Sequence, residues 1–154
     1  MRWKVLKYIR IKDVQKRIEA LEDKYGSLSY LHAEFSKGRM PPGQLDDYIE
    51  WNTMDHALRA YQEGEDFEYM AEEELELSSE EYGKLTPRRM ELLDHLTRSM
   101  AGSINELADQ LGRDVKNVYE DLQILENLDF ISLSKEGRRT IPTPIVYEIT
   151  LTFG

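Results

Sequence analysis

The stretch SINELADQLGRDVKNVYEDLQILENLDFI, residues 103–131, decides which fold we expect for this chain. Apolar residues recur at helical spacing on both sides of Gly112, and the glycine interrupts that pattern. Because glycine adopts the left-handed backbone that ends a helix, the stretch predicts two helices joined by a tight turn. Ser103 and Glu106 form a capping box for the first helix, and Asp114 caps the second.

The flanking sequence predicts one further helix before this pair and a β-hairpin after it. Thr86 and Pro87 are typical of the cap and the first residue of a helix. The apolar stripe of that helix consists of Met90, Leu93, Leu96 and Met100. After the pair, residues 130–134 (FISLS) and 145–153 (IVYEITLTF) have strand-like sequences, and residues 135–138 (KEGR) predict a turn. The expected fold class is therefore mainly α (α+β), a winged helix-turn-helix with an N-terminal helical extension.

The second helix of the pair has an outer face that is suited to DNA. The small residue Ala108 allows the two helices to cross closely, and Val118 packs back beneath it. The polar residues on the outer face and in the hairpin turn can then reach phosphates and base edges. The candidate DNA-binding residues are Arg113, Lys116, Asn117, Tyr119, Lys135, Arg138 and Arg139. Glu120 and Asp121 lie near the same face and would repel phosphate, so a protein-docking role is the alternative.

The charge is distributed unevenly along the 154 residues, whose formal net charge is -10. Residues 1–39 carry ten Lys or Arg and five Asp or Glu, residues 40–85 carry two and fourteen, and residues 86–154 carry eight and eleven. An acidic average argues against general DNA coating but is compatible with a small basic face. These blocks predict three segments. They are a helical dimerisation or partner-binding region (1–63), an acidic connector (64–85) and a DNA-binding domain (86–154).

The N-terminal region carries a heptad-like seam. Residues 1–11 fit either a strand or the start of a helix. The seam that follows consists of Ile11, Val14, Ile18, Leu21, Tyr25 and Leu28. This seam can pack within one chain or between two, and we expect a homodimer through it, because two recognition helices then bind a palindromic site. The basic residues before the seam, Arg2, Lys4 and Lys7, are either solvated or add contacts to the DNA backbone.

Further along, residues 38–43 (GRMPPG) predict a turn, followed by a helix over about residues 44–62. The expected apolar side of that helix consists of Leu45, Ile49, Leu58 and Tyr61. The acidic connector is expected to be partly helical. The acidic residues within 72–76 are then a solvated helix face, a contact for a basic partner, or a segment that covers the basic hairpin when DNA is absent.

Residues 84–153 resemble a known family. The segments LTPRRMELLDHL, SINELADQLGRDVKNVYEDLQILENLDFI and YEITLTF resemble a group of small prokaryotic, often archaeal, predicted transcriptional regulators with a MarR-like winged helix. Members of this group are often described as antitoxins of toxin–antitoxin pairs. The resemblance implies binding of double-stranded DNA through Lys116 and Asn117, and it implies a toxin protein as a further partner.

The N-terminal half more faintly resembles short antitoxin-type proteins. The matching residues are Tyr25-Gly26 and the segment DYIEW at residues 47–51. This resemblance makes Tyr48 and Trp51 candidate partner-binding residues. The alternative is that both residues lie in the core of a plain helical dimerisation arm.

Several classes of site are not expected. The chain has no cysteine, and its three histidines, His32, His56 and His95, stand in no metal-binding motif. No sequence typical of a phosphate-binding loop or an activated nucleophile is present, so we expect neither an enzyme nor a cofactor. No apolar run approaches the ~18 residues of a membrane span, and a reducing cytoplasm is the expected compartment.

The expected function is a sequence-specific DNA-binding transcriptional regulator, a repressor that acts as a dimer. The alternative is an antitoxin-type interaction module that neutralises a partner toxin through its N-terminal half.

Overall fold

The computed structural model describes residues 1–154, which form an α+β protein of two compact units. One is the helical unit, Ile9–Met70, and the other, the sheet unit, combines Met1–Tyr8 with Ala71–Gly154. These units differ from the segments expected from the charge blocks, which ended at residues 63 and 85. The difference arises because the first strand pairs with strands far away in the sequence, and charge patterns do not reveal such pairing.

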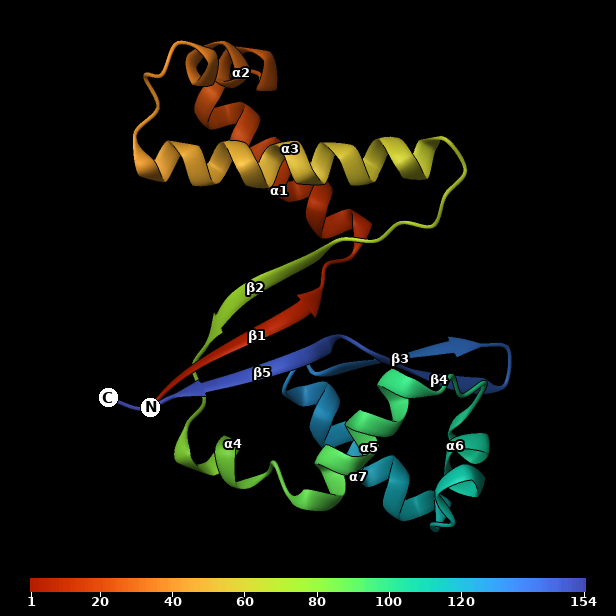
Figure 1. Ribbon diagram of the computed structural model, residues 1–154. Coiled ribbons are helices and arrows are strands. Elements are labelled where there is room, and N and C mark those ends of the chain that lie inside the picture. The colour runs from red at the N-terminus through yellow and green to blue at the C-terminus, as the bar shows by residue number, and fades with distance from the viewer. The chain divides into compact units, whose positions relative to one another are not determined.

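The helical unit contains three helices, whose ends follow from local sequence (Figure 1). Its helices are α1 (Ile11–Tyr25), α2 (Leu28–Ser36) and α3 (Pro42–Gln62). Gly26 ends α1 with φ 91°, and the Ser27 side chain caps α2 by accepting a hydrogen bond from the Tyr30 backbone N–H. The last residue of the predicted seam, Leu28, therefore belongs to the second helix. Pro42 begins α3 inside the predicted turn, because proline is favoured in the first turn of a helix.

The seam of α1 packs within its own chain. The buried cluster of this unit consists of Leu31, Tyr48 and Trp51. The seam residues that pack against this cluster are Ile18, Leu21, Tyr25 and Leu28. These side chains are already partly covered within one chain, and the dimer that we expected through the seam stays a prediction. On α3 the expected apolar side is wrong at Ile49 and Tyr61, which are exposed, whereas Met54 is buried.

The sheet unit contains a three-stranded sheet of order β2-β1-β5. These strands are β1 (Arg2–Tyr8), β2 (Met70–Leu75) and β5 (Val146–Thr152), and β1 pairs antiparallel with β5, with Val5 opposite Ile149. The ambiguous first residues therefore form a strand. The acidic connector contains β2 and the short helix α4 (Ser79–Gly83), so its acidic run lies on a strand and the expected helix face is wrong. Acidic residues have low strand propensity, but basic side chains of the neighbouring strand β1 stabilise β2 through opposite charge. One example is the ion pair of Lys7 with Glu73 at 2.6 Å.

The rest of the sheet unit contains the helix pair predicted around Gly112, which is confirmed. The elements are α5 (Pro87–Arg98), α6 (Ile104–Leu111), α7 (Val115–Asn127), β3 (Ile131–Glu136) and β4 (Arg139–Pro144). Gly112 ends α6 with φ 63°, and the Asp114 carboxylate caps α7 by accepting a hydrogen bond from the Lys116 backbone N–H. The predicted capping box of α6 is only half formed, because the Glu106 carboxylate accepts from Gly102 instead of Ser103.

The hairpin differs from the one expected. β3 pairs antiparallel with β4, which the prediction missed, while β5 pairs with β1. Pro142 and Pro144 made β4 hard to predict from the sequence, because proline has no backbone N–H to donate a hydrogen bond to a neighbouring strand. A two-stranded sheet leaves one edge of each strand unpaired, so both prolines are tolerated there.

One hydrophobic core joins α5, α6, α7 and the strands. Its fully buried members include Leu92, Leu107, Ala108, Val118, Leu122, Leu125 and Phe130. Two residues of the expected stripes are exposed. Met100 is 96% exposed because α5 already ends at Arg98, and Val115 lies on the outer side of the first turn of α7.

Candidate nucleic-acid interface

The N-terminal half of α7 presents polar side chains to solvent. Ala108 of α6 and Val118 of α7 are buried in the same core, which fixes the inner face of α7. The predicted residues Lys116, Asn117 and Tyr119 are exposed on the other side. Lysine and asparagine offer hydrogen-bond donors of the kind that contact base edges in a major groove.

Arg113 is engaged within the chain, so its assignment as a free DNA-contacting residue needs correction. Its Nη2 donates to Asp121 Oδ2 at 2.6 Å, and Arg89 Nε donates to Asp121 Oδ1 at 3.0 Å. Arg89 also donates to the Lys84 carbonyl oxygen at 2.8 Å. The Asp121 side chain is 13% exposed, so water screens these bonds weakly. The network ties α7 to the start of α5 and to the turn after α6.

The same network changes the expected role of Asp121. From the sequence, this carboxylate was expected to repel phosphate. In the structure it is neutralised by two guanidinium groups, so Asp121 orients the helix and leaves Glu120 as the exposed acid of this face.

A hollow of about 540 Å³ lies where α7 approaches the start of α5. Exposed residues Arg88 and Asn117 line it, together with the Asp121 network and Glu120. The first backbone N–H groups of α5 add partial positive charge nearby. The sequence analysis missed Arg88, because its position beside α7 results from packing that no local pattern reveals.

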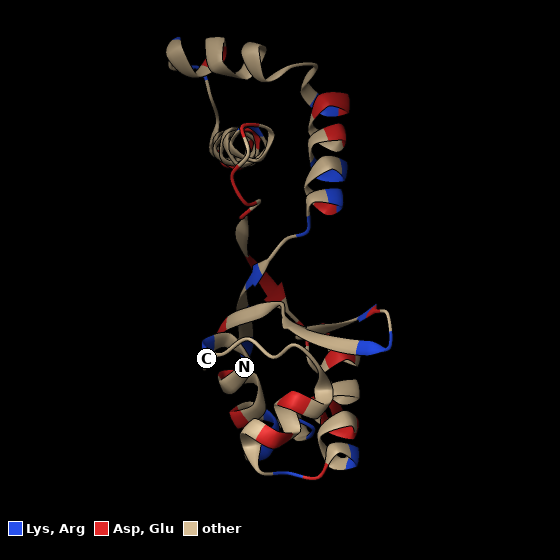
Figure 2. Cartoon of the chain, turned by 90° about the vertical axis from the view of Figure 1, so that its right-hand side faces the viewer, with Lys and Arg blue, Asp and Glu red and all other residues tan.

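The β3–β4 hairpin carries the remaining candidate residues. Lys135, Arg138 and Arg139 are exposed around its turn, and Figure 2 shows Lys and Arg gathered at that end together with an acidic residue, Glu136. The Leu133 backbone N–H donates to Glu126 Oε2 of α7 at 2.8 Å. The hairpin is thereby joined to the helix whose outer face carries the other candidates.

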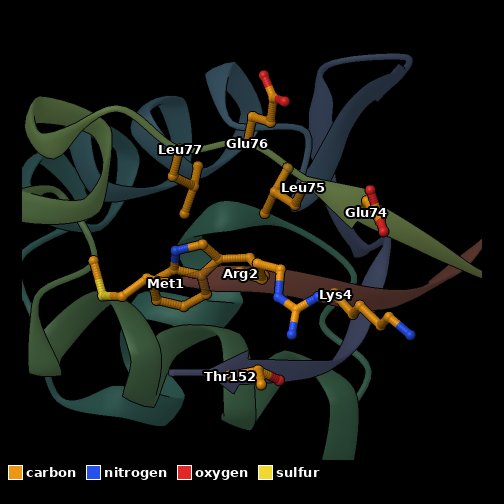
Figure 3. Close-up of a pocket in the computed structure, with 9 residues that line it drawn as sticks. Met1, Arg2, Lys4, Glu74, Leu75, Glu76, Leu77 and Thr152 are labelled. Atoms are coloured by element: carbon orange, nitrogen blue, oxygen red, sulfur yellow. The ribbon is translucent and has the colours of Figure 1, made fainter. Parts of the chain in front are cut away.

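The basic residues of β1 lie beside acidic ones. Arg2 and Lys4 line a hollow of about 640 Å³ together with Glu74 and Glu76 (Figure 3). Because the acidic run of β2 faces β1, the interpretation that it masks the basic hairpin is not supported. The proposed addition of these basic residues to a DNA interface loses support for the same reason.

The candidate partner-binding residues are core residues in the structure. Trp51 is 3% exposed and Tyr48 is buried with it. The Tyr48 hydroxyl also shares a hydrogen bond with His32 Nδ1 at 2.7 Å, and its ring stacks on Phe35. The sequence-based assignment is corrected accordingly, because neither side chain is available to a partner.

Part of the chain is similar to a known protein family. The model of the HVO_A0114 family matches residues 84–149, less than half of the chain, which span α5, α6, α7, β3, β4 and part of β5. A search of the curated proteins found no match. No helix has both the length and the apolar character needed to cross a membrane. No group of three or more His, Asp or Glu side chains is placed to hold a metal ion.

Proposed function

We propose that the sheet unit is a winged helix-turn-helix that binds double-stranded DNA, and that the protein is a cytoplasmic transcriptional repressor. The observation that carries this proposal is the arrangement of α7. Its outer face presents Lys116 and Asn117, while the Asp121 network holds its first turns and Glu126 joins it to the basic hairpin. A recognition helix needs both features, because base contacts require exposed donors and a fixed orientation.

In this proposal α7 enters the major groove and the hairpin follows the neighbouring backbone. Lysine discriminates guanine and asparagine discriminates adenine, so Lys116 and Asn117 supply sequence dependence. Lys135, Arg138 and Arg139 contact phosphates and position the unit. The exposed Glu120 disfavours close phosphate contact beside these residues and can accept from cytosine N4.

The acidic net charge then has a physical consequence. Few exposed basic residues serve the interface, so binding to unrelated DNA is weak and specific contacts dominate. The four candidate phosphate contacts, Arg88, Lys135, Arg138 and Arg139, correspond to a log–log salt slope of about -3.6 per protomer.

Fluorescence anisotropy with labelled duplex from upstream of this protein's own gene tests the proposal. We expect binding that exceeds binding to a scrambled duplex, and a loss of about 100-fold or more in the variant Lys116→Ala/Asn117→Ala. The matched control is Asn52→Ala/Arg59→Ala, which removes the same kinds of groups from exposed positions of α3. Equal affinity for both duplexes, or equal loss in both variants, would contradict sequence-dependent binding through α7.

A further inference from the structure

A partly apolar groove runs along α5 in the sheet unit. It consists of two neighbouring hollows of about 250 and 300 Å³, both lined by Thr97 and Tyr147. The first hollow also contains Met90, Leu93 and Ile149, and the second contains Ala101 and the prolines of β4. We call this surface, defined by Met90, Leu93, Thr97, Ala101, Tyr147 and Ile149, the α5 groove.

Large apolar side chains project beside the α5 groove. Met100 is 96% exposed at the rim of the second hollow, and Tyr147 is 45% exposed between the two hollows. An apolar projection beside an apolar hollow on one surface is what a symmetric dimer requires, since both copies then use the same patch. Much of the α1 seam is already covered within the helical unit.

The charged residues at the α5 groove are also arranged in a way that fits a twofold axis. Asp94 lines the first hollow and Arg98 the second, and the two form an exposed ion pair at 2.7 Å along one helix. If two α5 helices pack antiparallel about a point level with residue 96, Asp94 of each copy faces Arg98 of the other. In the same alignment Met100, which follows the C-terminal end of α5, lies near the N-terminal half of the other α5, where Met90 and Leu93 line the first hollow.

We propose that the α5 groove binds a second copy of this chain, with the two α5 helices antiparallel across a twofold axis. Two Asp94–Arg98 pairs flank the axis, and each Met100 fills the first hollow of the other copy. The proposal does not depend on DNA binding, because the groove and the polar face of α7 are separate surfaces of the sheet unit.

Sedimentation velocity of the full chain at micromolar to submillimolar concentrations tests this interface. We expect the wild-type chain to form a dimer. Asp94→Arg and Arg98→Asp should each weaken the dimer by about tenfold or more, because like charges then face each other. The double variant Asp94→Arg/Arg98→Asp should restore it, because the opposite charges are then exchanged on both copies.

Two controls separate this interface from effects on folding. Asp55→Arg/Arg59→Asp reverses another ion pair of the same spacing, 3.0 Å apart on α3, and should leave the dimer unchanged. Met100→Asp changes a side chain that contributes little to the fold, and it should weaken the dimer with unchanged circular dichroism. A monomeric wild type, a dimer insensitive to Asp94→Arg and Met100→Asp, or a double variant as weak as the single ones would overturn the proposal.

Discussion

Replacing Asp121 by asparagine should destabilise the sheet unit and also increase its affinity for DNA of unrelated sequence. The carboxylate accepts hydrogen bonds from Arg89 and Arg113 at 3.0 and 2.6 Å. Asparagine has nearly the same size but no charge, so two guanidinium groups would remain close together without a counter-charge. The orientation of α7 would then be less well fixed, and one positive charge beside it would be free.

The magnitude follows from the two bonds. Hydrogen bonds to charged groups contribute about 1.5–3 kcal/mol each, and asparagine retains one acceptor oxygen, so we expect a loss of about 2 kcal/mol. The Asp121 side chain is 13% exposed, which leaves little screening by water. In a unit of this size such a loss lowers Tm by roughly 10 °C. The freed positive charge should steepen the log–log salt slope for unrelated DNA by about 0.9.

Scanning calorimetry measures the first effect and salt-dependent anisotropy on scrambled duplex measures the second. The control is Asp109→Asn on α6, which changes the net charge equally at an exposed residue. If Asp121→Asn lowers Tm no more than Asp109→Asn, the network does not hold α7. If both variants gain the same affinity for unrelated DNA, net charge alone explains the gain, and the reasoning about the network fails.

Three further variants test other contacts. Arg88→Gln should weaken binding to all DNA sequences alike and reduce the salt slope by about 0.9, and a loss confined to the specific duplex would refute its role at a phosphate. Glu126→Ala removes the acceptor of the Leu133 N–H, so amide hydrogen exchange in residues 131–136 should become faster. Unchanged protection from exchange would show that this hydrogen bond does not hold the hairpin on α7. Tyr25→Phe should destabilise the helical unit, because the Tyr25 hydroxyl donates to Asp47 at 2.6 Å and this bond is the main cause of the lowered pKa of Asp47. Because the pKa of Asp47 lies below its unfolded value of about 3.9, the stabilisation from this hydrogen bond is present above about pH 4 and is lost as the pH falls below it. If Tyr25→Phe and the wild type unfold at the same acidic pH, this explanation is wrong.

The helix pair could be predicted because its determinants are local. Gly112 provides the left-handed turn, Asp114 the cap and Val118 the buried face, and all three effects act within a few residues. The exposure of Lys116 and Asn117 follows from the same helical periodicity. The exposed positions of these two residues could therefore be predicted without a structure, and their contact with DNA stays a prediction.

The errors concern features that depend on distant parts of the chain. The acidic strand β2 forms beside β1, and its sequence alone has low strand propensity. Arg113 is of a residue type that contacts phosphate, but it donates to Asp121 of α7, which also accepts from Arg89 of α5. The α1 seam fits one chain or two equally well by spacing, and only the structure shows that α2 and α3 partly cover it within one chain. Tyr48 was predicted to bind a partner but is buried, because the local sequence does not distinguish a buried aromatic residue from an exposed one.

The pairing of β1 with β5 has a consequence for biosynthesis. Arg2 lies opposite Thr152, so the two ends of the chain meet in one sheet (Figure 1). The helical unit, Ile9–Met70, is contiguous and can fold as soon as it leaves the ribosome. The strand β1 is synthesised before the helical unit, and its edge toward β5 stays unpaired until Val146–Thr152 has been translated. During that interval its edge is open to other extended segments, and the Lys and Arg residues that it carries disfavour such association.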